Sequence, residues 1–322
     1  MALPPSLQEQ IQSLLKNFPQ KNRVSLQEVL SKKYRTSPHK ALSSKEEVLL
    51  YIITRLPATY HVGENVLRVF KELWERAPVK TILDLGAGVG SSRWLFDSLF
   101  PGIDTLTLVE QNPFMLESGK AFSHALGHFE TCNYVTDSLT PHDLIFMSYT
   151  MSEVDQKHQE KVLKKVWDQT NQVLILIEPG TPAGFWTLNR ARTFLIQQGG
   201  YILAPCGHEA TCPMVMGENW CHFSTRLPRT LDHQRAKRAR LSHEDEKFSY
   251  LIVSKTPLEK NLPPRIIQKP MKAKGHVIFD VCTLQGIKRE TVTRSKAPDY
   301  KTQSRLEWGE KFSLKKLPEP LE

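Results

Sequence analysis

Apolar residues recur every three to four positions through the first part of the chain, a spacing that predicts amphipathic helices. Helices are expected at 6–18, 25–34, 43–56 and 61–77. Ser6 is a candidate cap for the first helix, and Pro57 is expected to end the third. These segments predict a helical region over residues 1–76.

After residue 77 the pattern changes to short apolar runs that alternate with helical segments. Strands are predicted at 79–84, 105–112, 142–148, 171–180, 201–205 and 247–256, with a weaker one at 129–135. Strands and helices of these lengths in alternation predict an α/β fold with a parallel, doubly wound sheet. We assign this sheet to a domain over residues 77–256.

The connection between the last two predicted strands is unusually long. Residues 206–246 fill it, and a structureless loop of that length is uncommon in a compact domain. A bound metal or cluster would order it. Beyond it, two strand-like segments on either side of Gly286 predict a hairpin, so residues 257–322 are interpreted as a small β-rich appendage.

Positive charge is concentrated in the C-terminal third. Residues 226–322 hold 22 of the 43 Lys and Arg and 12 of the 34 Asp and Glu, a net of +10; the remaining 21 and 22 leave a net of −1 for residues 1–225. A basic segment suits binding to nucleic-acid phosphates, and a solvated basic surface is the alternative. The candidate phosphate-binding residues are Arg226, Arg229, Arg235, Lys237, Arg238, Arg240, Lys272 and Lys274; only the family resemblance described below favours RNA as their partner.

A glycine-rich loop follows the first predicted strand and leads into a helix. It reads Asp84-Leu-Gly86-Ala-Gly88-Val-Gly90, and glycines there let the backbone approach a ligand at a helix N-terminus. The G-x-G-x-G spacing resembles the S-adenosylmethionine loop of class I methyltransferases and differs from the dinucleotide fingerprint.

That resemblance implies roles for four further side chains. Glu110, at the end of the next strand, matches the acidic residue that binds the ribose hydroxyls. Asp137 matches the position beside the adenine amine, and Tyr149 would border the methyl donor. Asp84 would orient the loop and the methionine amino group. No catalytic residue is identified, because methyl transfer can depend on proximity and alignment alone.

Four of the five cysteines lie in the last part of the chain, and they are Cys206, Cys212, Cys221 and Cys282. Without a secretory signal, these thiols are better interpreted as metal or cluster ligands than as disulfides. Four thiolates suit zinc as well as an iron–sulfur cluster, and the absence of paired C-x-x-C spacings favours the cluster modestly. Ordinary buried thiols are the alternative, and Cys132 is interpreted in that way.

Several segments together resemble one family, the methyltransferase-like proteins associated with the small ribosomal subunit, which comprises mitochondrial assembly factors and bacterial relatives. The segments are LPATYHVGENVLRVFKEL (56–73), DLGAGVG (84–90), SYTMSEV (148–154), IEPGTPAGF (177–185), APCGHEATCP (204–213), WCHFSTR (220–226), EDEKFSYLIVSK (244–255) and KGHVIFDVC (274–282). The resemblance implies S-adenosylmethionine binding, contact with small-subunit rRNA, and a [4Fe–4S] cluster held by the four cysteines, which would staple the appendage to the sheet.

These inferences lead to one expected function and two alternatives. We expect a monomeric small-subunit-associated protein that acts in ribosome assembly or translation. The alternatives are a catalytically active rRNA methyltransferase and a small-molecule methyltransferase with a structural zinc site. No apolar run is long enough to span a membrane. The N-terminal residues show no targeting pattern, so the expected location is the cytoplasm of a bacterium.

Overall fold

The computed structural model describes residues 3–16, 42–122, 124–258 and 262–312, and the helix expected at 25–34 lies outside them. The described helices are α1 (Pro5–Leu15), α3 (Lys45–Thr54), α4 (Leu56–Leu73), α5 (Ser92–Leu99), α6 (Pro113–Ala121), η1 (Met151–Glu153), α7 (Gln156–Asp168), α8 (Pro182–Gln197), α9 (Leu231–Ala236) and α10 (Tyr300–Gln303). The described strands are β1 (Thr81–Leu85), β2 (Thr105–Val109), β3 (His128–Glu130), β4 (His142–Ser148), β5 (Thr170–Pro179), β6 (Tyr201–Ala204), β7 (Phe223–Pro228), β8 (His243–Ser254), β9 (Arg265–Ile266), β10 (Met271–Ala273), β11 (His276–Thr283) and β12 (Gly286–Thr293).

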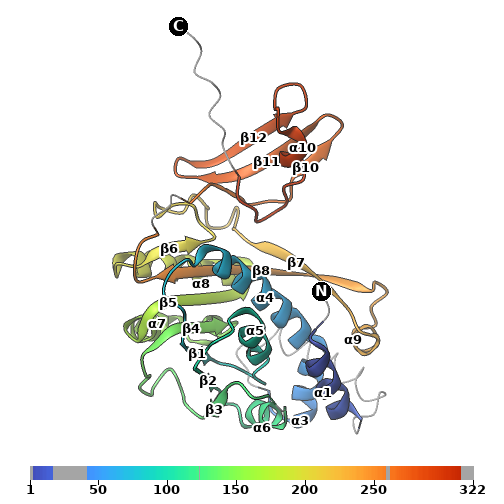
Figure 1. Cartoon of the computed structure of the whole chain (residues 1–322), viewed down its shortest axis with the longest axis vertical. Helices are drawn as coiled ribbons and strands as arrows, with labels where there is room; N and C mark the ends of the chain where they lie inside the picture. The colour runs from blue at the N-terminus through green and yellow to red at the C-terminus, as the bar shows by residue number, and fades with distance from the viewer. Residues whose placement is uncertain (1–2, 17–41, 123, 259–261, 313–322) are drawn as a thin grey trace.

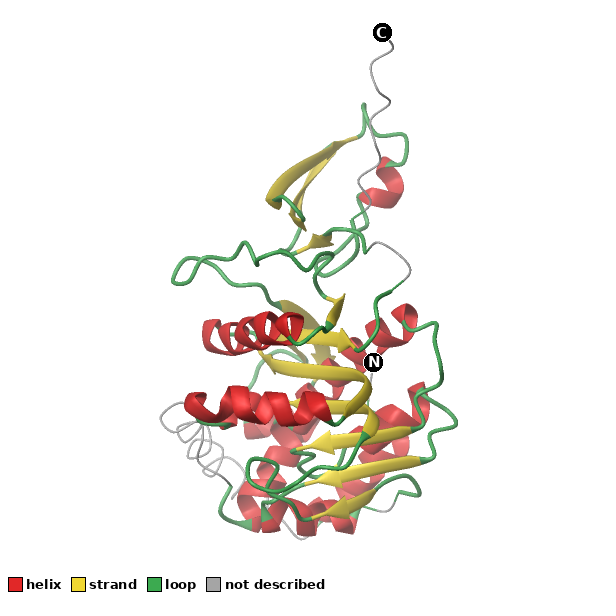
Figure 2. Ribbon diagram, turned by 90° about the vertical axis from the view of Figure 1, so that its left-hand side faces the viewer, coloured by secondary structure: helices red, strands yellow, loops and turns green. Residues whose placement is uncertain are grey.

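The main sheet has the strand order β3-β2-β1-β4-β5-β8-β6, with β7 paired to the remaining length of β8. Strands β1 to β5 run parallel to one another, and β8 runs antiparallel to both β5 and β6. The predicted doubly wound α/β sheet is therefore confirmed, with one reversed strand near its edge. Helices cover both faces of the sheet (Figure 2).

Two apolar layers hold those helices in place. On one face, α1, α3, α4 and α5 pack on alternate residues of the strands, such as Ile82 and Phe146; on the other face, α7 and α8 pack on their neighbours, such as Leu83 and Met147. Strands buried on both faces read as continuous apolar runs, which is why β4 and β5 were easy to predict.

Two helix boundaries differ from the sequence prediction for clear reasons. Pro57 lies in the first turn of α4, directly after α3 ends, and proline is well suited to that position because no intrahelical partner is needed there. Ser6 lies inside α1, whose cap is Pro4, and its hydroxyl accepts a hydrogen bond from Trp94 Nε1 at 3.0 Å. Ser44 does cap α3, by accepting from the Glu47 amide.

The long connection between β6 and β8 contains structure that the sequence prediction missed. Strand β7 pairs with the first half of β8 from Phe223↔Phe248 to Pro228↔His243, and α9 follows it. Backbone pairing therefore orders the second half of this insertion. The first half, between Ala204 and Phe223, carries three of the cysteines and has no helix or strand.

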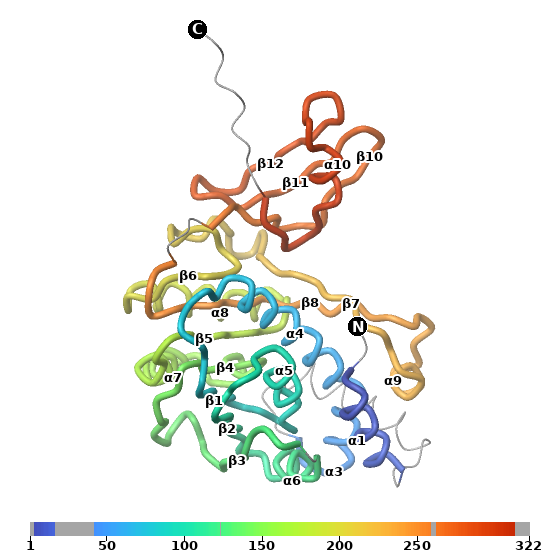
Figure 3. The backbone as a smooth tube through the Cα atoms, in the orientation of Figure 1, coloured from blue at the N-terminus to red at the C-terminus, as the bar shows by residue number. Residues whose placement is uncertain are grey.

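The C-terminal appendage is a second, smaller sheet with the order β10-β11-β12, with β9 paired to β11. The predicted hairpin is confirmed: β11 and β12 pair in register around Gly286, whose φ is 108°. Phe279 and Phe312 pack in its own small core. The appendage stands beyond β6 at one end of the molecule (Figures 1 and 3).

Candidate cofactor cleft and cysteine pocket

The glycine loop lies at the carboxyl end of β1 and lines a cavity of about 1660 Å³. Gly86, Gly88 and Gly90 all have positive φ, at 74°, 58° and 71°. A side chain at Gly86 would also overlap the methyl group of Thr150, so both conformation and close packing require glycine there. The position matches the crevice in which such sheets bind ligands.

Glu110 follows β2 and fixes the loop from the neighbouring strand. Its Oε2 accepts a hydrogen bond from the Gly88 amide at 2.8 Å, and its Oε1 accepts one from the Asn112 amide at 2.7 Å. Asp84 accepts a short hydrogen bond from the Ser92 hydroxyl. Burial raises the pKa of Asp84 to about 7, and Glu110 contributes to that rise. Both carboxyl groups line the cavity, as the sequence predicted.

Another part of the cavity wall is formed by residues that follow β4 and by the last residues of β5. Tyr149 has a φ of 62°, which is uncommon for a bulky residue and is typical of functional sites. Its hydroxyl is buried and has no hydrogen-bond partner among the described residues. Desolvation raises the pKa of Glu153 to about 7, and the nearby Glu110 and Glu178 raise it further. Burial also raises the pKa of Glu178 to about 7, although hydrogen bonds from Ser152 act in the opposite direction. Sequence reasoning missed these two carboxyl groups.

Asp137 does not line the cavity. It is exposed, and its carboxylate accepts hydrogen bonds from the Asn133 amide at 2.8 Å and the Thr136 hydroxyl at 2.9 Å. These contacts, the Asn133 amide foremost, lower the pKa of Asp137. Tyr134 and Val135 of the same turn face the cavity instead. In this structure Asp137 stabilises the turn after β3, and its role at the adenine is unsupported by the geometry.

Residues of the N-terminal helical region also line the cavity. Tyr51 and Arg55 line it, and Arg55 Nη2 forms an ion pair with Glu246 Oε1 of β8 at 3.1 Å. The two side chains are partly buried, at 31% and 12% exposed, and the pair joins the helical region to the sheet. It spans 191 residues of sequence, which is why no local pattern predicted it.

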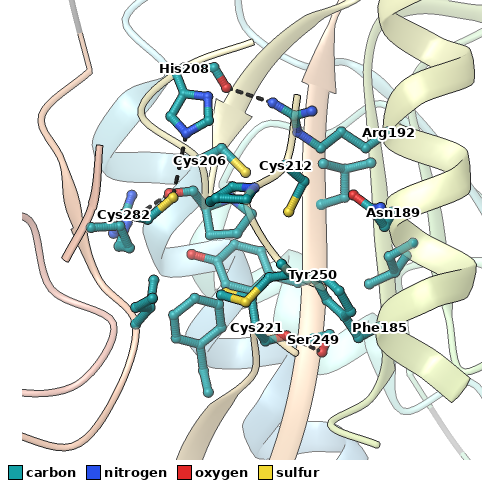
Figure 4. A pocket seen from close by; sticks show the side chains of 18 residues that line it. Phe185, Asn189, Arg192, Cys206, His208, Cys212, Cys221, Ser249, Tyr250 and Cys282 are labelled. Atoms are coloured by element: carbon teal, nitrogen blue, oxygen red, sulfur yellow. Dashed lines mark hydrogen bonds between the residues drawn. The ribbon is translucent and has the colours of Figure 1, made fainter. Parts of the chain in front are cut away.

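The four cysteines converge on a second pocket. Cys206, Cys212 and Cys221 come from the connection between β6 and β7, and Cys282 comes from β11 of the appendage. Their sulfur atoms surround one space (Figure 4). Burial raises the pKa of Cys221 well above its usual value, and the other three thiols raise it further.

Within the described residues, no group of three or more His, Cys, Asp and Glu side chains is already arranged as a metal site. The pocket therefore brings the predicted ligands together, and the metal or cluster itself stays a prediction. His208 lies beside them, with Nε2 at 3.4 Å from Cys282 Sγ. Cys132 lies apart, in the loop after β3, and packs against the sheet core.

At least half of the predicted RNA-binding residues form ion pairs with other described residues. Glu244 on β8 accepts from both Arg229 Nε at 3.1 Å and Lys237 Nζ at 2.8 Å. The remaining pairs are Arg226 with Asp245 at 2.7 Å and Lys272 with Glu307 at 2.5 Å. Arg235, Arg238, Arg240 and Lys274 are exposed.

The strand order and the glycine loop together define the class of protein. A parallel sheet with one reversed strand between the last two, and a G-x-G-x-G loop at the carboxyl end of its first strand, is the Rossmann-like fold of class I methyltransferases. A family model described as mitochondrial small ribosomal subunit Rsm22 matches residues 45–313. The chain belongs to that family, and the resemblance found in the sequence is confirmed.

Two groups of curated proteins illustrate the relationship. The Rsm22-cox11 tandem proteins 1 and 2, mitochondrial, of Schizosaccharomyces pombe are 27% identical over 332 residues, covering 83% of this chain and 43% of theirs. The human ribosome assembly protein METTL17, mitochondrial, is 27% identical over 264 residues, covering 74% of this chain and 56% of its own. The chain thus spans less than half the length of the yeast relatives.

Solved methyltransferases resemble the chain only distantly. Magnesium protoporphyrin IX methyltransferase from Synechocystis PCC 6803, solved with bound SAM, is 10% identical with a TM-score of 0.40, covering 71% of this chain and 97% of its own. The assignment of the fold therefore rests on the strand order and the loop.

The expected cytoplasmic location is wrong. The matching family model and the curated relatives from yeast and human all carry mitochondrial names. Absence of a recognisable leader pattern was a weak basis for that expectation. In the part of the chain that the structure describes, no helix combines the length and apolarity that crossing a membrane requires.

The buried Glu178 yields a prediction about stability and pH. Its pKa is raised to about 7 in the folded chain from about 4.3 in an unfolded one. Between these values the folded chain keeps a proton that the unfolded chain loses, so stability falls as pH rises. Glu178→Gln should flatten this slope and raise the free energy of unfolding at pH 8 by about 1–3 kcal/mol.

Urea unfolding at pH 5, 6, 7 and 8 measures this effect. Glu160→Gln, an exposed position on α7, is the matched control and should leave the slope unchanged. Equal slopes for the parent and Glu178→Gln would contradict the assignment of a buried, partly protonated carboxyl group.

Proposed function

We propose that this protein binds the small ribosomal subunit during assembly in mitochondria and contacts its rRNA through the basic C-terminal part. The observation that carries the proposal is the family match over residues 45–313, which includes the cleft, the cysteine pocket and nearly the whole described appendage. The name of the human relative, a ribosome assembly protein, supports the same activity. We further propose that the chain acts as a monomer.

The unpaired cations are the proposed phosphate contacts. Arg240 and Lys274 are exposed, and neither forms an ion pair with a described residue. Arg226 is exposed as well, but Asp245 holds its guanidinium through two hydrogen bonds at 2.7 and 2.8 Å. A cation that is already paired gains less from a phosphate, because it must first give up its carboxylate partner.

The difference between paired and unpaired cations can be tested by measuring how tightly the full chain binds small-subunit rRNA at several salt concentrations. Arg240→Gln with Lys274→Gln should weaken binding and reduce the slope of log affinity against log salt by about 1 for each cation removed. Arg226→Gln is the matched control and should have a smaller effect. Affinity that does not change with salt would contradict rRNA binding and favour a small-molecule substrate.

We also propose that S-adenosylmethionine occupies the large cavity. The fit rests on the loop: Gly88 opens toward the cavity, and Glu110 presents its carboxylate beside it. Glu110 would bind the ribose hydroxyls, Asp84 would face the cationic methionine end, and Tyr149 would border the methyl group. The cavity exceeds the ~300–1,000 Å³ of ordinary small-molecule sites, which leaves room for an acceptor.

Glu110→Ala should weaken S-adenosylmethionine binding about 10- to 100-fold, because hydrogen bonds to a charged group contribute about 1.5–3 kcal/mol each. Isothermal titration calorimetry provides the measurement. Glu117→Ala, an exposed carboxylate on α6 whose partner is Lys45, should bind like the parent. Unchanged affinity in Glu110→Ala would remove Glu110 from the proposed site.

A second candidate function is methyl transfer to rRNA. The observation that favours it is a pair of carboxyl groups that line the cavity and have raised pKa values, Glu153 and Glu178, neither of which is assigned to the donor. Such groups can orient an acceptor and manage its proton. Labelled donor incubated with immature small subunits should then label the RNA; absence of label from RNA and protein would leave only the binding function.

For the cysteine pocket we propose one metal centre held by all four thiols, a [4Fe–4S] cluster, with zinc as the alternative. The fit is chemical: four soft donors share one pocket, and burial raises the pKa of the Cys221 and Cys282 thiols, so that their ionisation calls for a compensating cation. When bound, the centre would cross-link the first half of the insertion to β11. An anaerobic preparation that is colourless and holds zinc without iron would replace the cluster by zinc.

A further inference from the structure

Two arginines are buried beside the four thiols and come from opposite sides of the pocket. Arg192 projects from α8 of the main domain, and Arg265 belongs to β9 of the appendage. They are 5% and 4% exposed. Arg192 lies across the pocket from Cys282 in Figure 4, beside Cys212. Buried guanidinium groups are rare without an anionic partner.

The partners that the structure does provide are neutral. Arg192 Nη2 donates to the carbonyls of His208 and Ala210 at 2.8 and 2.9 Å. Arg265 donates to the carbonyls of Pro205 at 2.9 Å and Gly309 at 2.8 Å. Among the described residues, neither guanidinium forms an ion pair with a carboxylate, and Arg192 Nε is buried without any acceptor.

A centre bound by four thiolates would supply the missing negative charge. Zinc held by four thiolates is a dianion, and so is the oxidised form of a four-iron cluster with the same ligands. Two guanidinium cations balance a dianion.

The charges also balance separately on the two sides of the pocket. The main domain brings three thiolates, the divalent metal core and Arg192, which sum to zero. The appendage brings one thiolate, from Cys282, and Arg265, which also sum to zero. Closure of the appendage onto the main domain would then bury no net charge, and burying net charge is the costly step for an ionic site.

We propose that Arg192 and Arg265 are the counter-cations of the thiolate-bound metal centre, one supplied by each side of the pocket. They position and stabilise the centre through charge, and their carbonyl contacts hold the guanidinium groups in place. This inference rests on the metal centre proposed above but does not depend on which metal fills it. Arg192 Nε is the donor left available to a sulfur atom of the centre.

The test compares a neutral and a cationic replacement at each position. Arg192→Gln and Arg265→Gln keep an amide donor for the loop carbonyls but remove the charge, whereas Arg192→Lys and Arg265→Lys keep the charge. Full-length protein is purified anaerobically, and metal content is measured before and during incubation with a chelator. Circular dichroism and the melting temperature establish that each variant is folded. Arg68→Gln, an exposed arginine paired with Glu64 on α4, is the control.

We expect the Gln variants to lose metal about 10- to 100-fold faster or bind it that much more weakly, the range found when partners of metal ligands are removed. The Lys variants should lie close to the parent. If the centre contains iron, its reduction potential should become more negative in the Gln variants, because a nearby cation that stabilises the added electron has gone.

The outcomes separate this inference from the proposed metal centre. Parent protein that binds neither iron nor zinc contradicts both. Parent protein that holds metal, with Gln variants that retain it equally well, overturns the counter-cation role alone. Equal losses in the Gln and Lys variants would assign the effect to the guanidinium hydrogen bonds and likewise overturn the role of charge. If the parent protein holds zinc and no iron, only the assignment of an iron–sulfur cluster is overturned. The rate of zinc loss to a chelator then still tests the role of the two arginines.

Discussion

The pairing of β8 is the constraint on which the rest of the structure depends. Its second half lies between β5 and β6 and completes the main sheet, while its first half extends past the sheet to pair with β7. Because side chains alternate along a strand, this single register decides which residues reach which neighbour. Glu246 is thereby placed against Arg55 of the helical region, and Glu244 against Arg229 and Lys237 of the insertion. A shift by one residue would separate all of these pairs.

The same strand places the two pockets back to back. Glu178 on β5 faces the cofactor cleft, and its register partner Ser249 on β8 lines the cysteine pocket, where its hydroxyl donates to the Cys221 carbonyl at 2.9 Å. Helix α8 is shared in the same way, because Thr187 lines the cleft and Leu188 lines the cysteine pocket. Ligands in the two sites would therefore contact the same rigid elements, which gives a physical route for coupling between them.

The sequence predicted those features that depend on local pattern. Buried strands such as β4 and β5, the glycine loop and Glu110 follow from apolar runs and from spacing that any segment carries by itself. Strand β7 was missed because its partner, the polar first half of β8, has no apolar alternation and pairs only through its backbone. Glu153 and Glu178 were missed because a carboxyl group becomes distinctive only when folding places it at a cavity beside other carboxyl groups. The convergence of Cys282 with the other three thiols was expected from family resemblance, since their spacing alone fixes no shared site.

Ion pairs formed on folding neutralise part of the positive charge of the C-terminal third. Its net charge of +10 suggests a broad basic surface, yet β8 carries a compensating acidic stretch, and Glu244 alone contacts three basic side chains. Burial would raise the pKa of Glu244, but hydrogen bonds from His233 and Lys237 outweigh it and hold that pKa well below its usual range. The lowered pKa favours the ionised form of Glu244, which keeps its basic partners occupied. Part of the positive charge is therefore structural, and Arg265 is a further cation of this third that is buried inside the fold. The cations available to an external phosphate are the smaller set at the tip of the insertion and along the edge of the appendage sheet, which restricts where the proposed contact with rRNA could form.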